Sequence, residues 1–306
     1  MLSNLNPAAE TFLTNIERVQ RSVDEASRQV SSGLRVNTAS DAPDEVDTIL
    51  QLRTDTTRNT QIQANLALAQ TDAESADGAL NSATQLLDRA RALGAQGATF
   101  TQDATGRQSL AGEVEGLLEQ MVSISRTAVQ GRYIFSGDDA NTPPYQLDLT
   151  SATGVDRLTT AVSTRRLEDP AGGSFAVAKT AGDIFDTRNA DDTPAAGNVF
   201  AALNSLRTAL LNNDPAGIDA ATAAIQTASD HLNISQGFYG SVLNRIQDAT
   251  NYGQSYDVRL KTELSQKVDA DVTAAAMTLT QGNTQLQAAF QMQARVPHTS
   301  LFDFLG

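Results

Sequence analysis

The chain has 306 residues, a formal net charge of −14, no cysteine and no tryptophan. This acidic balance argues against nucleic acid and anionic membrane surfaces as partners, because both attract clustered Lys and Arg. The lack of cysteine excludes disulfides, thiolate nucleophiles and Cys-based zinc sites. Hydrophobic residues make up 40% of the chain, but much of that share is alanine. A narrow core of packed helices is therefore favoured over a wide globular one.

Residues 1–40 carry the first strongly periodic segment. Apolar residues recur at alternating spacings of three and four, the heptad pattern of a helix that buries one side against another helix. Pro7 predicts that the helix begins near that residue, and Gly33 predicts its end. The seam positions selected as an assembly interface are Leu5, Phe12, Ile16, Val19, Val23 and Val30.

Residues 41–141 are predicted to form the first half of a helical rod. Ser40 or Asp41 is expected to cap a helix that carries Pro43 in its first turn and runs to about residue 98. A cation site is the alternative for the acidic residues here, and the capped helix is preferred on spacing grounds. At 1.5 Å per residue the helix would be roughly 80 Å long, which is typical of a coiled coil. A third heptad helix is expected to end at Gly131.

An aromatic corner, GRYIFSGDDANTPPY, occupies residues 131–145. It places three rings within fifteen residues of an otherwise aromatic-poor chain. Tyr133–Phe135 are expected to begin a strand whose rings close the base of a following β-rich insert. Gly137 and Pro143–Pro144 are expected to turn the chain into that insert.

Residues 142–196 differ from the helical segments, because they are rich in Thr, Val, Gly and turn pairs. They predict a small β-rich insert domain, with a hairpin around the sequence DPAGG. Helices return over 197–262, with a looser stretch at TNYGQSYD (250–257), and a terminal assembly helix covers 263–306. Asp269 is expected to cap that terminal helix. Its seam positions are Leu264, Val268, Val272, Leu279, Leu286 and Phe290.

The fold class predicted is mainly α: an elongated antiparallel bundle or coiled coil of the N- and C-terminal helices with a small β-rich insert. No catalytic constellation stands out. His231 and His298 are isolated, and no Gly-rich phosphate loop, metal-ligand spacing or nucleophile elbow is present. We expect no cofactor, no metal and no enzymatic activity. The terminal helices are expected to fold fully only when neighbours cover their seams.

Two motifs resemble the flagellin superfamily. QVSSGLRVNTASDAPDEV (29–46) resembles its N-terminal signature, and residues 269–306 resemble its Ala-, Gln- and Leu-rich C-terminus. Within that superfamily, GRYIFSG followed by NTPPY is similar to the members found at the junction of hook and filament. The residues that carry the resemblance are Ser32, Gly33, Arg35, Asn37, Asp41, Pro43, Gly131, Arg132, Tyr133, Phe135, Gly137 and Pro144.

The resemblance implies a structural adaptor of the bacterial flagellum. Its partners would be a hook-associated protein on the hook side, flagellin on the filament side, and like subunits in a ring. It also implies an export chaperone, passage through the type III export apparatus without a cleaved signal, and an extracellular location. Composition by itself would suggest the cytoplasm. The alternatives are a filament-forming flagellin, or a secreted binding module or enzyme housed in the β insert.

Overall fold

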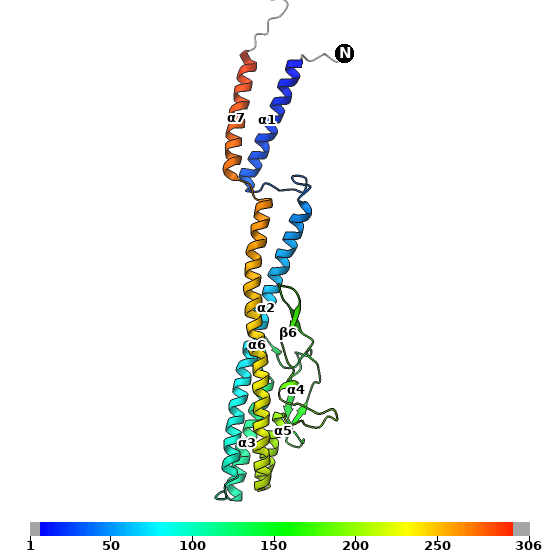
Figure 1. Cartoon of the computed structure of the whole chain (residues 1–306), viewed down its shortest axis with the longest axis vertical. Coiled ribbons are helices and arrows are strands. Elements are labelled where there is room, and N and C mark those ends of the chain that lie inside the picture. The colour runs from blue at the N-terminus through cyan, green and yellow to red at the C-terminus, as the bar shows by residue number, and fades with distance from the viewer. Residues whose placement is uncertain (1–6, 296–306) are drawn as a thin grey trace, which may run out of the picture. The chain divides into compact units, whose positions relative to one another are not determined.

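The structure, a computed structural model, describes residues 7–295 and is mainly helical there (Figure 1). Its helices are α1 Pro7–Ser32, α2 Val46–Gly97, α3 Ala104–Ser125, α4 Ala181–Ile184, α5 Val199–Leu211, α6 Pro215–Val268 and α7 Val272–Arg295. Its strands are β1 Ala128–Val129, β2 Arg132–Tyr133, β3 Tyr145–Leu147, β4 Val155–Arg157, β5 Arg166–Glu168 and β6 Ser174–Ala176. Of the helices in this described part, none combines the length and hydropathy that a membrane span requires. The predicted mainly α fold is confirmed.

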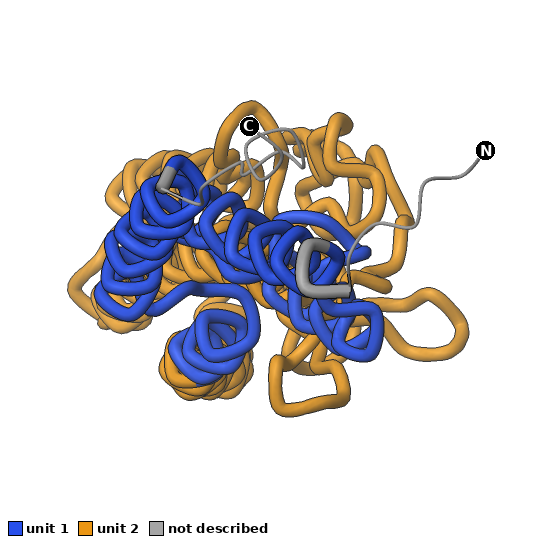
Figure 2. The backbone as a smooth tube through the Cα atoms, turned by 90° about the horizontal axis from the view of Figure 1, so that it is seen from above, with its two compact units in different colours: residues 1–58, 256–306 blue, residues 59–255 orange. Residues whose placement is uncertain are grey.

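The chain forms two compact units (Figure 2). Unit 1 contains residues 1–58 and 256–306, and unit 2 contains residues 59–255. Both termini therefore belong to one unit, and the middle of the chain belongs to the other. The five-segment division expected from the sequence stays a prediction.

Unit 2 is built on α3, α5 and parts of α2 and α6, with the irregular insert beside them. The heptad residues of α2 are buried, with Leu80, Leu87 and Leu93 no more than 1% exposed. Small residues allow the helices to approach closely: a Cβ on Gly94 would meet the side chains of Leu206 and Thr222. The α2 seam thus closes against α5 and α6, which explains why alanine and glycine share it with leucine.

Arg107, a buried side chain of α3, joins two connections at one end of this bundle: the α2–α3 loop and the α5–α6 turn. Its Nε donates to the carbonyl of Gly97 at 2.7 Å, and its Nη1 donates to the side chain of Asn213. Asp103 caps α3 by accepting a hydrogen bond from the amide of Gly106. One guanidinium therefore links the α2–α3 loop to the α5–α6 turn.

α3 ends at Ser125, six residues before the end expected from the sequence. Residues 128–133 instead form the β1–β2 hairpin, which turns at Gln130 and Gly131 with φ of 52° and 77°. Two consecutive positive φ values are the mark of a tight hairpin turn. Gly131 is a turn residue here rather than a helix terminator.

The insert contains two further antiparallel pairs, β3–β4 and β5–β6. The β5–β6 pair confirms the hairpin predicted around DPAGG, and its inward residues Leu167 and Phe175 are buried. Arg245 of α6 lies over the Phe175 ring at 4.4 Å, which holds the hairpin to that helix.

α6 runs without a break through residues 250–257, so the expected interruption at TNYGQSYD is wrong. Ile246, Ala249, Gly253 and Leu260 are buried along one side of this stretch. Their spacing of three, four and seven keeps the helical seam intact, and tertiary packing overrides the weak local helix preference.

Candidate assembly surface and the helix-break junction

α1 and α7 pack side by side in unit 1. From α1, Phe12, Ile16, Val19 and Val23 are half-buried. From α7, Leu279 and Leu286 are half-buried as well. Two helices can hide only one stripe each, so these large side chains stay partly exposed.

Small residues form the closest part of this contact. The heptad spacing of the sequence includes Ala26 and Ala275, but Gly282 and Ala289 were missed. Ala26, Ala275 and Gly282 are buried, and Ala289 is half-buried. A Cβ on Gly282 would overlap Cγ2 of Val23, so the α7 backbone lies directly on that side chain. The signal was present in the sequence, because positions 275, 282 and 289 are one heptad apart.

Several predicted seam residues lie elsewhere. Val30, Val272 and Phe290 are 36%, 45% and 60% exposed. Leu264 and Val268 belong to α6 and pack in a small cluster with Val36 and Ile49 rather than in the α1–α7 contact. Leu5 lies outside the described residues.

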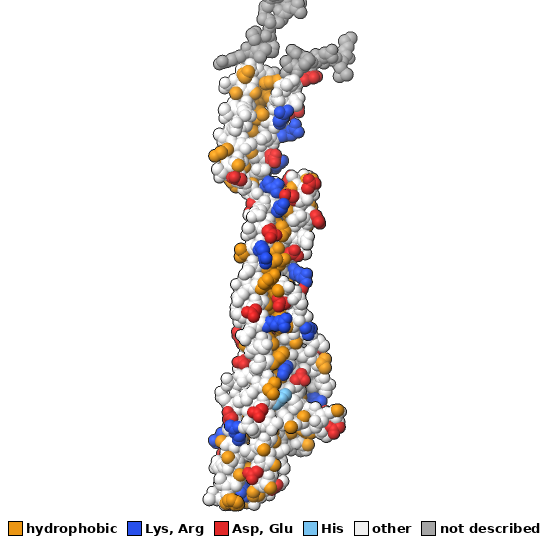
Figure 3. Space-filling view, in the orientation of Figure 1, with side chains coloured by type: hydrophobic (Ala, Val, Ile, Leu, Met, Phe, Trp, Pro, Cys, Tyr) orange, Lys and Arg blue, Asp and Glu red, His pale blue; other side chains and the backbone are white. Residues whose placement is uncertain are grey.

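Much apolar surface of the α1–α7 pair is uncovered (Figure 3). Met277 and Met292 of α7 are 68% and 71% exposed, and Leu13 of α1 is 48% exposed. α7 has no charged residue from Val272 to Ala294, whereas α1 carries both acidic and basic side chains on its exposed side. An uncharged helix with exposed methionines is suited to contact with further helices.

Both chain breaks of unit 1, between α1 and α2 and between α6 and α7, are joined by backbone hydrogen bonds. Leu34 and Asp269 form an antiparallel bridge. The amide of Arg35 donates to the carbonyl of Val268 at 2.7 Å, and the amide of Ala270 donates to that of Gly33 at 3.0 Å. Gly33 has a φ of 71°, which lets the chain leave α1 toward this bridge.

An ionic cluster covers the same junction. Glu45 accepts from the guanidinium of Arg35 and, at 3.1 Å, from Nζ of Lys267. The hydrogen bonds from Arg35 and then Lys267 lower the pKa of the Glu45 carboxyl below its ordinary value. Arg35 also donates to the carbonyl of Lys267, at the end of α6. A residue of the SSGLR motif therefore connects the two breaks.

The turn after this motif is closed by its own side chains. Asp41 accepts from the amides of Thr38 and Asn37 at 2.7 and 2.9 Å, and these bonds lower its pKa. Asn37 donates to the hydroxyl of Ser32. Asp41 thus orders the loop and does not cap α2, which begins five residues later at Val46. Pro43 is exposed in the loop, before the helix rather than in its first turn.

Asp271, and not Asp269, caps α7. Its Oδ1 accepts from the amide of Ala274 at 3.0 Å. Asp269 instead pairs with Leu34 in the bridge and accepts from the hydroxyl of Ser265. Because Asp269 is engaged at the break after α6, the next acidic residue, Asp271, caps α7.

The aromatic corner forms a ring cluster at the base of the insert. Phe135 is fully buried, 5.7 Å from Phe185 and 6.4 Å from Tyr239 in edge contacts. Tyr145 lies 5.0 Å from Phe200. Such pairs add to the burial of their area. Tyr133 is only half-buried and contributes to the β1–β2 hairpin rather than to this cluster.

The remaining corner residues tie the insert to the bundle. Arg132 lies 3.6 Å from Asp72 of α2, and Arg165 of the insert reaches the same carboxylate at 2.6 Å. Gly137 has a φ of 62° and lies against the backbone of Val162, so a side chain would not fit there. Pro144 is buried beside the ring cluster.

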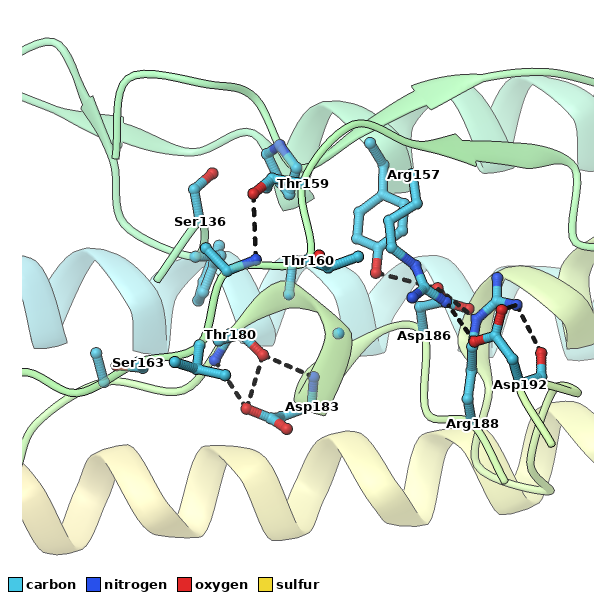
Figure 4. A pocket seen from close by; sticks show the side chains of 18 residues that line it. Ser136, Arg157, Thr159, Thr160, Ser163, Thr180, Asp183, Asp186, Arg188 and Asp192 are labelled. Atoms are coloured by element: carbon cyan, nitrogen blue, oxygen red, sulfur yellow. Dashed lines mark hydrogen bonds and ion pairs between the residues drawn. The ribbon is translucent and has the colours of Figure 1, made fainter. Parts of the chain in front are cut away.

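A buried ionic network lies next to these rings (Figure 4). Asp186 accepts from the hydroxyl of Tyr145 at 3.0 Å, from Nε of Arg188 at 3.0 Å and from the Asn198 amide at 2.7 Å. Arg157 lies 3.3 Å from the same carboxylate. Burial, followed by the Asp186 charge, raises the pKa of Tyr145. Within residues 7–295 no group of three His, Asp or Glu side chains is placed to hold a metal ion.

Paired terminal helices, two helix breaks joined by backbone hydrogen bonds and a closed helical bundle are features typical of a structural protein. Comparison with known families identifies residues 3–140 as a bacterial flagellin N-terminal helical region and residues 222–305 as a bacterial flagellin C-terminal helical region. The chain belongs to the flagellin superfamily, a family of structural flagellar proteins.

Relatives within this superfamily are similar along most of their length. Flagellar hook-associated protein 3 of Escherichia coli is 24% identical over 90% of both chains. A flagellin of Bacillus subtilis is 27% identical over 96% of both chains. A solved structure of a putative flagellar hook-associated protein from Vibrio parahaemolyticus matches 75% of this chain and 100% of its own, with 18% identity and a TM-score of 0.63. At that identity, the structural likeness shows the fold alone.

Proposed function

We propose that this chain is the structural adaptor that joins a hook-associated protein on the hook side to the flagellin filament. The observation that carries the proposal is the α1–α7 pair, whose seam is only half covered and whose α7 carries no charged residue from Val272 to Ala294. A pair of this kind gains stability when like helices cover it, since each further Leu or Phe buried contributes roughly 1.5–3 kcal/mol. Its similarity to hook-associated protein 3 supports the adaptor role.

The partners follow from this role. Hook and filament components would contact the two sides of a ring of like subunits. The assembly interface would comprise the α1 and α7 seams. It would include Val30, Val272 and Phe290, which are exposed in the monomer, and Leu5, which lies outside the described residues. Exposed Val272 and Phe290 then become contact residues between subunits rather than within one.

The adaptor role requires that the chain be exported from the cell. The chain would travel unfolded through the flagellar type III apparatus with the help of an export chaperone, and would act outside the cell. Its role is mechanical and needs no catalysis. The two-helix terminal pair is compatible with such a route, because it adds little stability to the monomer and forms its full contacts after export.

A filament-forming flagellin is the second candidate, because the Bacillus subtilis flagellin is similar over 96% of both chains. Purified protein seeded with filament fragments separates the two roles. Growth of long polymers would favour the flagellin, and binding without growth would favour the adaptor.

Substitution of a seam residue tests the assembly surface itself. Leu279→Asp or Phe12→Asp places a charge in the α1–α7 contact and is expected to abolish assembly while unit 2 stays folded. Leu158→Asp is the matched control, because Leu158 is an exposed leucine of the insert in unit 2. Assembly would be followed by complementation of a strain that lacks the junction protein, and folding by circular dichroism. Seam variants that still support filaments would refute this interface.

A further inference from the structure

Two cavities in the insert adjoin at a pair of arginines. The first has a volume of 460 Å³ and lies beside the irregular segment 158–164 and α4. The second has a volume of 510 Å³. Arg157, Thr160, Arg188 and Asp192 line both cavities. Figure 4 shows these four residues in the first cavity. These volumes fall within the range of small-molecule sites.

Two carboxylates contact the arginines, and their environments differ. The Asp186 side chain is fully buried and is held by Tyr145 and Asn198 as well as by both arginines. The Asp192 side chain is 72% exposed and lies 3.1 Å from Arg157 and 3.5 Å from Arg188. Loss of Asp186 would remove the buried partner of two largely buried guanidinium groups, whereas the Asp192 carboxylate is accessible to solvent.

The arginines have donors to spare. Arg157 uses Nη2 for both carboxylates, while its Nε and Nη1 have no acceptor among the described residues. Arg188 uses Nε and Nη1, and its Nη2 has none among them either. The two guanidinium charges exceed the single charge of Asp186 by one, so Asp192 or an equivalent anion completes the balance.

Asp192 reaches the arginines from a tight loop. Its φ of 61° is in the left-handed region, which Asn and Asp tolerate better than most residues. The loop is closed by the amide of Asp192 on the carbonyl of Asn189 and by the amide of Asn189 on the carbonyl of Thr193. A short loop thus holds one exposed carboxylate beside both guanidinium groups.

We propose that Arg157 and Arg188 form a binding site for a small hydroxylated carboxylate, and that Asp192 occupies this site in its absence. The carboxylate of the ligand would take the position of the Asp192 side chain. Hydroxyl side chains line the cavities that open from that position. Thr160 lines both cavities, Thr159 and Ser163 line the far part of the first, and Ser151 and Thr193 line the second (Figure 4). An acid of monosaccharide size matches the cavities and these hydroxyls.

Binding of D-glucuronate to the full chain tests the site, with D-glucose as the neutral analogue. Isothermal titration is expected to show glucuronate binding and no glucose binding. Asp192→Asn removes the competing carboxylate, keeps a residue suited to the positive φ, and is expected to tighten glucuronate binding by about tenfold. Arg157→Lys in the Asp192→Asn chain keeps a positive charge beside Asp186 but removes the guanidinium fork, and is expected to abolish the gain.

Asp156→Asn is the matched control, because Asp156 lines the second cavity and its carboxylate accepts from Gln146 and pairs with neither arginine. It makes the same change in net charge and is expected to leave the glucuronate affinity within about twofold of the parent. Equal gains from Asp156→Asn and Asp192→Asn would overturn the proposal, since they would reflect net charge alone. Equal binding of glucose, or no binding to the folded Asp192→Asn chain, would overturn it as well.

Discussion

α2 and α1 carry the same heptad pattern, yet the two seams end in different environments. In unit 2, Leu80 and Leu87 of α2 are no more than 1% exposed, because several helices converge on them. In unit 1, α1 packs along α7, and Ile16 of α1 stays half-buried. The number of helices that meet at a seam, rather than the pattern of the seam, decides whether it becomes a closed core or a surface that can bind further helices.

The exposed sides of the two regions differ in charge as well. Unit 2 and α1 carry acidic and basic side chains toward solvent, whereas α7 carries none between Val272 and Ala294. Charged residues keep a helix soluble and discourage chance contacts. Their absence from α7 fits a surface that is covered in the assembled state.

The largest expected effect comes from truncating a closed seam. Leu118→Ala in unit 2 removes a fully buried side chain and is expected to lower the free energy of unfolding by about 2–5 kcal/mol. Leu279→Ala in α7 removes a half-buried side chain and is expected to cost less than about 1.5 kcal/mol. Urea unfolding followed by circular dichroism gives both values. Equal losses of unfolding free energy in the two variants would show that the two seams do not differ in burial as described.

A second test addresses the small-residue contact between α1 and α7. Gly282→Ala adds a methyl that overlaps Val23, so the helices must separate at an expected cost of about 1–3 kcal/mol. Gly78→Ala is the control, because a Cβ there meets nothing within 4 Å. It is expected to stabilise α2 by about 0.5–1 kcal/mol. Thermal unfolding compares the two variants, and Val23→Ala should relieve part of the Gly282→Ala loss.

The junction of the helix breaks offers a smaller effect. Glu45→Gln removes the carboxylate shared by Arg35 and Lys267, and is expected to speed amide hydrogen exchange over residues 33–45 severalfold. Glu263→Gln changes the same charge on the exposed part of α6 near the junction. Amide exchange over residues 33–45, measured by mass spectrometry, should be faster in Glu45→Gln than in Glu263→Gln. Unchanged protection in Glu45→Gln would show that the backbone bridge alone orders this segment.

Acid should reproduce the Glu45 effect more weakly. The folded-state pKa of Glu45 lies below its ordinary value of 4.5. The carboxylate therefore stabilises the junction fully above about pH 4.5, and this contribution disappears as the pH falls through the lower, folded-state pKa. Exchange over 33–45 should thus rise at acid pH after correction for the intrinsic rate. In the Glu45→Gln chain, the acid-dependent rise in exchange should be smaller. It should not vanish, because the pKa of Asp41 is also lowered and protonation of Asp41 weakens the same segment.

Local patterns in the sequence predicted much of this architecture. The heptads located α1, α2 and α7, the DPAGG turn located the β5–β6 hairpin, and the aromatic corner located the base of the insert. The errors arose where local signals compete with packing. Gly131 reads equally well as a helix end or a hairpin turn, and TNYGQSYD has weak helix preference but a buried seam.

The sequence by itself determined which residues are apolar, at what period they recur, and that the two ends of the chain carry matching seams. Periodicity is a property of neighbouring residues and can be read without knowing any partner. Only the tertiary structure decided that Gly282 lies on Val23, that Arg35 and Lys267 share Glu45, and that Arg157 meets Asp186 and Asp192. These contacts join residues distant in the chain, and their geometry depends on how the whole unit closes.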